Sequence, residues 1–171
     1  MKVEEFLNSK MADFNRWPGF LFLNVARLGA SVLTEMLSEL DITANQWPVF
    51  HQIYEHEGST QKSLAGYCMK DPSAVLRTLD ILEKKELIVR KIDEDDRRVF
   101  KIYLTEKGKK AHQKAFNIAL QCTIMACDGL TIEDLDKFFD IAVTLYKNWS
   151  NMKDNADIIK ESFDSSIANQ K

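Results

Sequence analysis

Apolar side chains recur at helical spacing over most of this 171-residue chain. The pattern predicts four longer helices, at residues 17–41, 43–58, 105–128 and 131–150. The first is expected to bury a stripe formed by Leu21, Val25, Leu28, Val32 and Leu40. The second starts with a capping box at Thr43 to Gln46, and Pro48 inside it is expected to remove one helical hydrogen bond.

The middle of the chain carries two shorter helices. Thr60 is a good N-cap for the first, and Asp71 with Pro72 is a strong start for the second. The second helix is expected to turn Val75, Leu76, Leu79 and Leu82 inward. Because only residues 69–71 separate the two helices, the pattern predicts the tight turn of a helix-turn-helix.

The other face of this second helix suits contact with nucleic acid. It combines short side chains with one long cation: Ser73, Ala74, Arg77 and Thr78. Such groups can reach base edges and phosphates. Thr60, Gln61 and Lys62, at the start of the preceding helix, complete the helical part of the expected DNA-binding surface.

A polar hairpin follows. Residues 87–89 read as a strand, and residues 99–104 alternate with the period of two that marks a second strand. The tip between them contains Arg97 and Arg98, and a basic side chain there can enter the minor groove. The neighbouring acids are unfavourable for DNA, but an aspartate near the tip can fix the loop by hydrogen bonding its backbone, which holds the arginine in position.

Charge is unevenly distributed along the chain. Residues 61–115 hold 14 basic and 9 acidic side chains, whereas the remainder carries a net charge of −8. A locally basic module in an acidic protein is compatible with DNA binding, because phosphate contacts act over short, screened distances. A solvated surface of mixed charge is the alternative explanation, and the helix-turn-helix pattern argues against it.

At these residues the chain resembles the MarR family of transcriptional regulators, most strongly from about Ile42 to Lys110. The motifs that carry the resemblance are Leu64-Ala65, Val75 to Leu79, Leu82 to Lys85, Asp96-Arg97-Arg98 and Leu104 to Gly108. The resemblance implies an obligate dimer formed by the first and last helices. It also implies that the arginine of an Asp-x-Arg motif, here Asp96 and Arg98, contacts the minor groove. Glu86 departs from the family's usual glycine, at a position that often needs positive φ.

The expected fold is therefore mainly α with a small β-hairpin wing. Residues 1–41 would provide N-terminal dimerisation helices and one wall of a ligand pocket. Residues 42–107 would form the winged helix-turn-helix, and residues 108–171 would form C-terminal dimerisation helices.

The last predicted helix carries an apolar face that indicates a homodimer. The face consists of Leu135, Phe138, Phe139, Ala142, Val143 and Tyr146. A contiguous apolar surface usually marks an interface, and a symmetric pair is its simplest closure. Two recognition helices about 34 Å apart would then read a palindromic operator of roughly 16–20 base pairs. Packing of the terminal helices on each other within one chain is the alternative.

An effector site is predicted near the junction of the first helix with the winged domain. The candidate residues are Trp17, Phe20, Arg27, Trp47, Phe50 and His51. An aromatic wall with one cation suits a small aromatic carboxylate or its thioester. Equally, these aromatic residues can be ordinary core.

Several other functions lack a sequence signal. Phosphate-binding loops and hydrolase or metalloprotease motifs are missing, so no enzyme, cofactor or metal site is predicted. Three cysteines, with none near the N-terminus, give little support to redox sensing. No signal peptide or membrane span is apparent, and a cytoplasmic protein is expected. The alternatives to a ligand-released repressor are a ligand-independent or redox-responsive regulator, or a winged-helix protein-interaction module.

Overall fold

The computed structural model describes residues 5–6, 14, 17–94 and 96–155. The chain divides into two compact units, Met1–Ala126 and Cys127–Lys171. The first contains α2 (Pro18–Met36), η2 (Ser38–Leu40), α3 (Trp47–Glu55), β1 (Ser59–Thr60), α4 (Gln61–Tyr67), α5 (Pro72–Lys84), β2 (Ile88–Ile92), β3 (Phe100–Leu104) and α6 (Glu106–Ala126). The second contains α7 (Ile132–Asp154). The outer ends of the predicted dimerisation segments, 1–4, 7–13, 15–16 and 156–171, lie outside the described residues.

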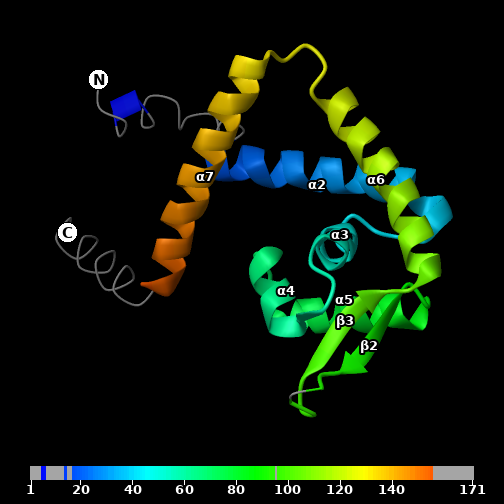
Figure 1. The fold of residues 1–171 in the computed structure, drawn as a ribbon. Helices are drawn as coiled ribbons and strands as arrows, with labels where there is room; N and C mark the ends of the chain where they lie inside the picture. Colours follow the sequence, from blue (N-terminus) through cyan, green and yellow to red (C-terminus); the bar gives the residue numbers. More distant parts are fainter. Residues whose placement is uncertain (1–4, 7–13, 15–16, 95, 156–171) are drawn as a thin grey trace. The chain divides into compact units, whose positions relative to one another are not determined.

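The first unit is built around one apolar core. Helices α3, α4 and α5 pack against each other and against the sheet, and β2 and β3 project from them as a hairpin (Figure 1). The largest fully buried side chains include Phe50, Leu64, Leu79, Leu82 and Ile102. The mainly α fold with a small β wing is thus confirmed.

The sheet has three antiparallel strands in the order β1-β3-β2, where the sequence predicted two. Strand β1 is only two residues long, with Ser59 opposite Ile102. Gly58, at a φ of 82°, lets the chain turn from α3 into this strand, and its N–H donates to the carbonyl of Ile102 at 2.9 Å. The added strand fixes the start of α4 to the wing.

The predicted helix caps form, with two corrections. Thr60 accepts a hydrogen bond from the Ser63 N–H, and Thr43 and Gln46 form reciprocal capping bonds. Pro48 occupies the first turn of α3, because the helix begins at Trp47. The expected loss of a hydrogen bond is therefore wrong, since first-turn N–H groups have no partner within a helix. Asp71 takes the N-cap position of α5, but its side chain makes no capping bond.

The exit from α5 uses a strained residue and a close backbone approach. Glu86 adopts a φ of 59°, the positive φ that the family's usual glycine at this position implied. Leu87, the next residue, lies very close to Gly108 of α6. A Cβ added at Gly108 would lie 1.9 Å from the Leu87 carbonyl oxygen, so only glycine fits there. The Gly108 N–H donates to the Thr105 hydroxyl at 2.9 Å. This junction sets where α6 leaves the winged domain.

The expected burial of the stripe at residues 17–41 is wrong for four of its five members. Leu21, Val25, Leu28 and Val32 are exposed, with Val25 68% accessible, whereas Leu40 is partly buried against the core. In the second unit, α7 begins with a capping box between Thr131 and Asp134. Its apolar face is also exposed in the isolated chain, including Phe138, Phe139, Val143 and Tyr146. Among the described helices, none is long and apolar enough to cross a membrane.

Candidate nucleic-acid interface

Helices α4 and α5 form a locked helix-turn-helix. The turn between them passes through Met69, which adopts a left-handed φ of 50°. The Lys70 N–H then donates to the Ala65 carbonyl at 3.0 Å. The Gln61 side-chain amide donates to the Pro72 carbonyl at 3.1 Å. This last bond ties the first residue of α4 to the first residue of α5, so the two helix starts are held together.

The outward face of α5 presents the predicted polar residues. Ser73, Ala74 and Arg77 are exposed, whereas Thr78 is half-buried and its hydroxyl donates to the Ala74 carbonyl at 3.0 Å. Arg77 forms no ion pair with any residue that the structure describes. Its guanidinium is therefore available to an external anion.

The wing tip is organised by its own carboxylates. Asp96 accepts hydrogen bonds from the Arg98 backbone N–H at 3.0 Å and from its Nε at 3.1 Å. These two bonds hold the pKa of the Asp96 carboxyl below its usual value. Asp93 accepts from the Asp96 N–H at 3.3 Å and pairs with Lys101 at 2.7 Å. The prediction that an aspartate fixes this loop is confirmed, and Arg98 still has 90% of its side chain exposed.

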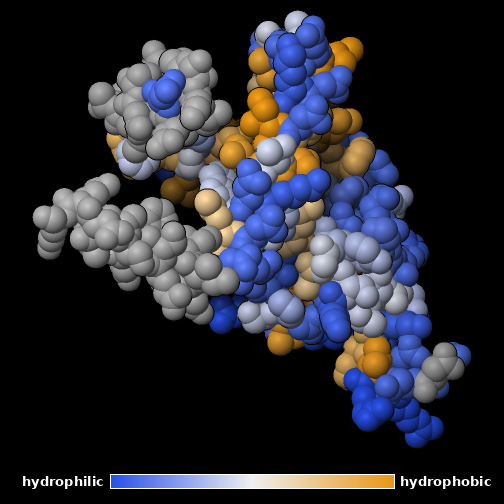
Figure 2. All heavy atoms as spheres, turned by 90° about the vertical axis from the view of Figure 1, so that its left-hand side faces the viewer, coloured by the Kyte–Doolittle hydropathy of each residue, from blue (hydrophilic) through white to orange (hydrophobic). Residues whose placement is uncertain are grey.

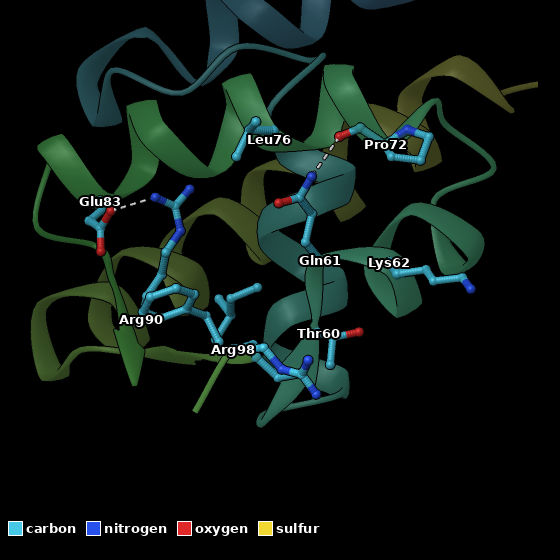
Figure 3. A pocket seen from close by; sticks show the side chains of 11 residues that line it. Thr60, Gln61, Lys62, Pro72, Leu76, Glu83, Arg90 and Arg98 are labelled. Carbon is cyan, nitrogen blue, oxygen red and sulfur yellow. Dashed lines mark hydrogen bonds and ion pairs between the residues drawn. The ribbon is translucent and has the colours of Figure 1, made fainter. Parts of the chain in front are cut away.

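An open groove of about 820 Å³ lies between α5 and the hairpin (Figure 3). Four predicted residues line it: Thr60, Gln61, Lys62 and Arg98. The other predicted residues of α5 and the wing tip do not line the groove. They are the exposed Arg97 and the outward residues of α5, Ser73, Ala74, Arg77 and Thr78. The wing that borders the groove is hydrophilic except for a small apolar spot (Figure 2).

Sequence reasoning missed seven of the eleven residues that line the groove: Pro72, Leu76, Glu83, Arg90, Val99, Phe100 and Ile102. Leu76 was expected in the core but is 41% exposed, because the inward face of α5 ends where the groove begins. Phe100 was predicted to share a strand face with Ile102, which is buried, yet Phe100 is 50% exposed. Arg90 and Lys91 follow each other in β2, so no signal in the sequence distinguishes Arg90 as a groove residue.

Residues 42–100 match the MarR family model. This winged helix region belongs to the MarR family of transcriptional regulators. The HTH-type transcriptional regulator YybA of Bacillus subtilis is 27% identical over 137 residues, covering 80% of this chain and 89% of YybA.

Solved structures agree with this assignment. The transcriptional regulator SlyA is 25% identical, with a TM-score of 0.70, and covers 76% of this chain and 92% of its own. A MarR mutant from E. coli complexed with operator DNA is also 25% identical, with a TM-score of 0.69; the match covers 74% of this chain and 91% of that one. These relatives are regulators rather than enzymes.

The predicted effector residues fall into separate groups. Phe14 contacts both Trp17 and Phe20, with ring centroids 5.0 and 4.5 Å apart. Arg27 contacts Asn24 of its own helix at 3.5 Å. Trp47 and His51 stack on α3 with centroids 5.2 Å apart, and Phe50 beside them is fully buried in the core.

The structure also contains a separate apolar cavity of about 380 Å³ between α2 and α6. Its lining comprises Val25, Leu28, Gly29, Val32, Met36, Cys122, Met125 and Ala126, and includes none of the six predicted effector residues. The effector site therefore stays a prediction.

A histidine pair joins α3 to α6. His51 Nδ1 lies 3.0 Å from His112 Nε2, and the Tyr54 ring stacks on His112 at 4.0 Å. Burial, followed by the charge of His51, lowers the pKa of His112 to about 4. In the described part of the chain, no group of three or more His, Cys, Asp or Glu side chains is placed to hold a metal ion.

Proposed function

We propose that a homodimer of this chain binds a palindromic DNA operator, represses transcription there, and is released by a small aromatic or anionic ligand. The observation that carries the DNA-binding part is the Asp96–Arg98 arrangement. It holds an exposed arginine at the wing tip beside the groove that α5 borders. Phosphate contacts and base-edge contacts can then be made by one continuous surface.

The two arginines should contribute differently. Arg98, at the hairpin tip, is placed for the narrow and strongly negative minor groove. Arg77, on the exposed face of α5, is placed for base edges or phosphates in the major groove. The similarity to a MarR mutant from E. coli in complex with operator DNA supports DNA binding by this chain.

Binding titrations test this surface. The probe is a duplex that the wild-type protein enriches from a random-sequence pool, compared with a scrambled duplex of equal composition. Arg98→Ala is expected to weaken binding of the enriched duplex by about 1–3 kcal/mol. Arg77→Ala should weaken binding and relax the sequence preference. Lys114→Ala, which removes an exposed cation from α6, is the matched control. Unchanged binding by both arginine variants would remove this surface from the function.

The homodimer is supported by the exposed apolar stripe of α2 and the exposed apolar face of α7. Val25→Lys places a charge on the most exposed part of the first of these surfaces. The variant is expected to shift the molecular mass measured by light scattering from dimer to monomer and to lose operator binding. A wild-type protein that remains monomeric at micromolar concentration would contradict the homodimer.

Release by an effector is supported by the half-buried Trp47 and His51 and by the aromatic group around Trp17. Benzoate, salicylate and cinnamate, each with its coenzyme A thioester, are suitable probes. A binding ligand should quench tryptophan fluorescence and lower operator affinity together, as a population shift requires. Absence of both effects across the panel would favour the ligand-independent alternative.

A further inference from the structure

Arg90 connects the wing to the DNA-facing helix at two points. Its Nη1 donates to Glu83 at 2.9 Å, and its Nη2 donates to Asp80 at 2.6 Å. Both carboxylates belong to α5, whereas Arg90 belongs to β2 and pairs with Ile102 across the ladder. Figure 3 shows the Arg90 side chain reaching from its strand to Glu83 on the helix.

The geometry of this contact restrains α5 more than one ion pair would. The guanidinium is planar and rigid, and a different nitrogen serves each carboxylate, so both rotation and sliding of the helix are opposed. We call the contact of Arg90 with Asp80 and Glu83 the Arg90 clamp. The Arg90 side chain is 22% exposed, so this clamp is partly shielded from water. A lysine at this position would keep the charge but offer a single point of attachment.

The two acids are otherwise unexpected. Asp80 and Glu83 have side chains 56% and 40% exposed, on a helix proposed to approach DNA, and Glu83 lines the groove itself. Carboxylates there repel phosphates, so electrostatics alone predicts that removing them strengthens binding to any duplex. Their presence is explained if they orient α5 relative to the wing.

We propose that Arg90, through Asp80 and Glu83, is a positioning residue that fixes the angle between α5 and the wing and thereby sets sequence discrimination. The inference rests on the proposed DNA-binding function. Readout by α5 and by the wing tip must occur in register on one duplex, because base contacts depend on geometry whereas phosphate attraction tolerates displacement. Loosening the clamp should therefore reduce specific binding while non-specific binding persists.

The test uses the full chain with the enriched and scrambled duplexes, titrated over a series of NaCl concentrations. Asp80→Asn combined with Glu83→Gln replaces both charged acceptors of Arg90 with neutral amides, which weakens both contacts and raises the net charge by two. We expect this variant to bind the scrambled duplex more tightly and the enriched duplex more weakly. The ratio of the two affinities should fall about tenfold, the loss typical of one misplaced base contact.

Two further variants separate position from charge. Arg90→Lys keeps the charge, so the dependence of binding on salt should stay unchanged while the affinity ratio falls. Glu106→Gln combined with Glu133→Gln adds the same charge by neutralising acids that pair with Lys109 and Lys137 on other helices. This control should bind both duplexes equally or more tightly, with the affinity ratio preserved. Thermal melting identifies any variant that fails to fold, and Arg90→Lys then decides the question alone.

The outcomes are distinct. If removal of the two acids strengthens binding to both duplexes by the same factor, the acids only repel DNA and the clamp is overturned. If Arg90→Lys keeps the wild-type affinity ratio, Arg90 contributes only its charge and not its two-point contact with α5, and the proposal is wrong. If selection with the wild-type protein enriches no sequence, the proposed function itself is wrong. This outcome is known before any variant is tested, so it cannot be confused with failure of the Arg90 proposal.

Discussion

The Nδ1 atom of His51 and the Nε2 atom of His112 lie 3.0 Å apart, so one hydrogen bond joins α3 of the winged domain to α6. A single proton occupies the bond, with one ring donating and the other accepting. The His112 side chain is 3% exposed and is covered by Tyr54 and Trp47. A second proton would place two donors opposite each other in a buried site.

This pair predicts a pH-dependent stability. The pKa of His112 is lowered from 6.5 to about 4 in the folded chain, so between these values the unfolded chain binds more protons. The stability that neutral His112 contributes is therefore complete above about pH 6.5 and is lost as the pH falls towards 4. The slope can reach about 1.4 kcal/mol per pH unit.

Urea unfolding at pH 7.5, 6 and 5, at one fixed protein concentration, measures this effect. His112→Gln should be less stable than the wild type at pH 7.5, and the difference should shrink at pH 5. His56→Gln, which removes an exposed imidazole, is the control and should leave the wild-type slope intact. A stability difference between the wild type and His112→Gln that does not change with pH would contradict the argument.

Glu86→Gly is expected to stabilise the chain by about 1 kcal/mol, because glycine adopts the φ of 59° without strain. The ion pair that Glu86 makes with Lys107 at 3.2 Å is exposed and contributes little. Glu86→Ala loses the same ion pair but keeps a Cβ, so it should not stabilise. Equal stabilisation by both variants in urea unfolding would assign the effect to charge instead of backbone conformation.

Gly108→Ala is expected to destabilise the chain by about 3 kcal/mol, because the new methyl group would overlap the Leu87 carbonyl and force backbone movement. Gly66→Ala on α4 is the matched control. No atom lies within 4 Å of its added Cβ, and alanine is the better helix former. A melting temperature for Gly108→Ala equal to that of the wild type would rule out the close approach of α6 to the end of α5.

Asp96→Asn tests the organisation of the wing. It removes an acid near DNA yet is expected to weaken operator binding severalfold, since Arg98 loses its charged acceptor. Glu94→Gln neutralises an exposed acid in the same loop and should bind DNA as well as the wild type or better. Tighter binding by Asp96→Asn would mean that Asp96 only repels phosphate.

Features governed by nearby sequence could be predicted well. The Thr60 cap, the Thr43–Gln46 capping box and the contact of an aspartate with the wing-tip backbone each depend on residues at most three positions apart. These contacts can therefore be predicted from the sequence without knowledge of the tertiary structure. The helix-turn-helix was predictable for the same reason, because its turn and its two helix starts are local.

Features that depend on tertiary contact were missed. His51 and His112 are 61 positions apart, and no spacing rule joins them. Strand β1 has two residues, too few to show alternation, and forms only because β3 offers it an edge. The Arg90 clamp likewise required knowing which face of α5 the hairpin meets. The exposure of the α2 stripe could not be read from periodicity, which marks an apolar face without saying what covers it.

The most direct test of the account is selection of duplexes from a random-sequence pool by the wild-type protein at near-physiological salt. The account predicts enrichment of two inverted half-sites centred about 10 base pairs apart, one helical turn, since two symmetry-related α5 helices would read them. That enrichment should disappear with Arg77→Ala and weaken with Arg98→Ala. Recovery of duplexes with no shared sequence, at affinities equal to the unselected pool, would contradict it.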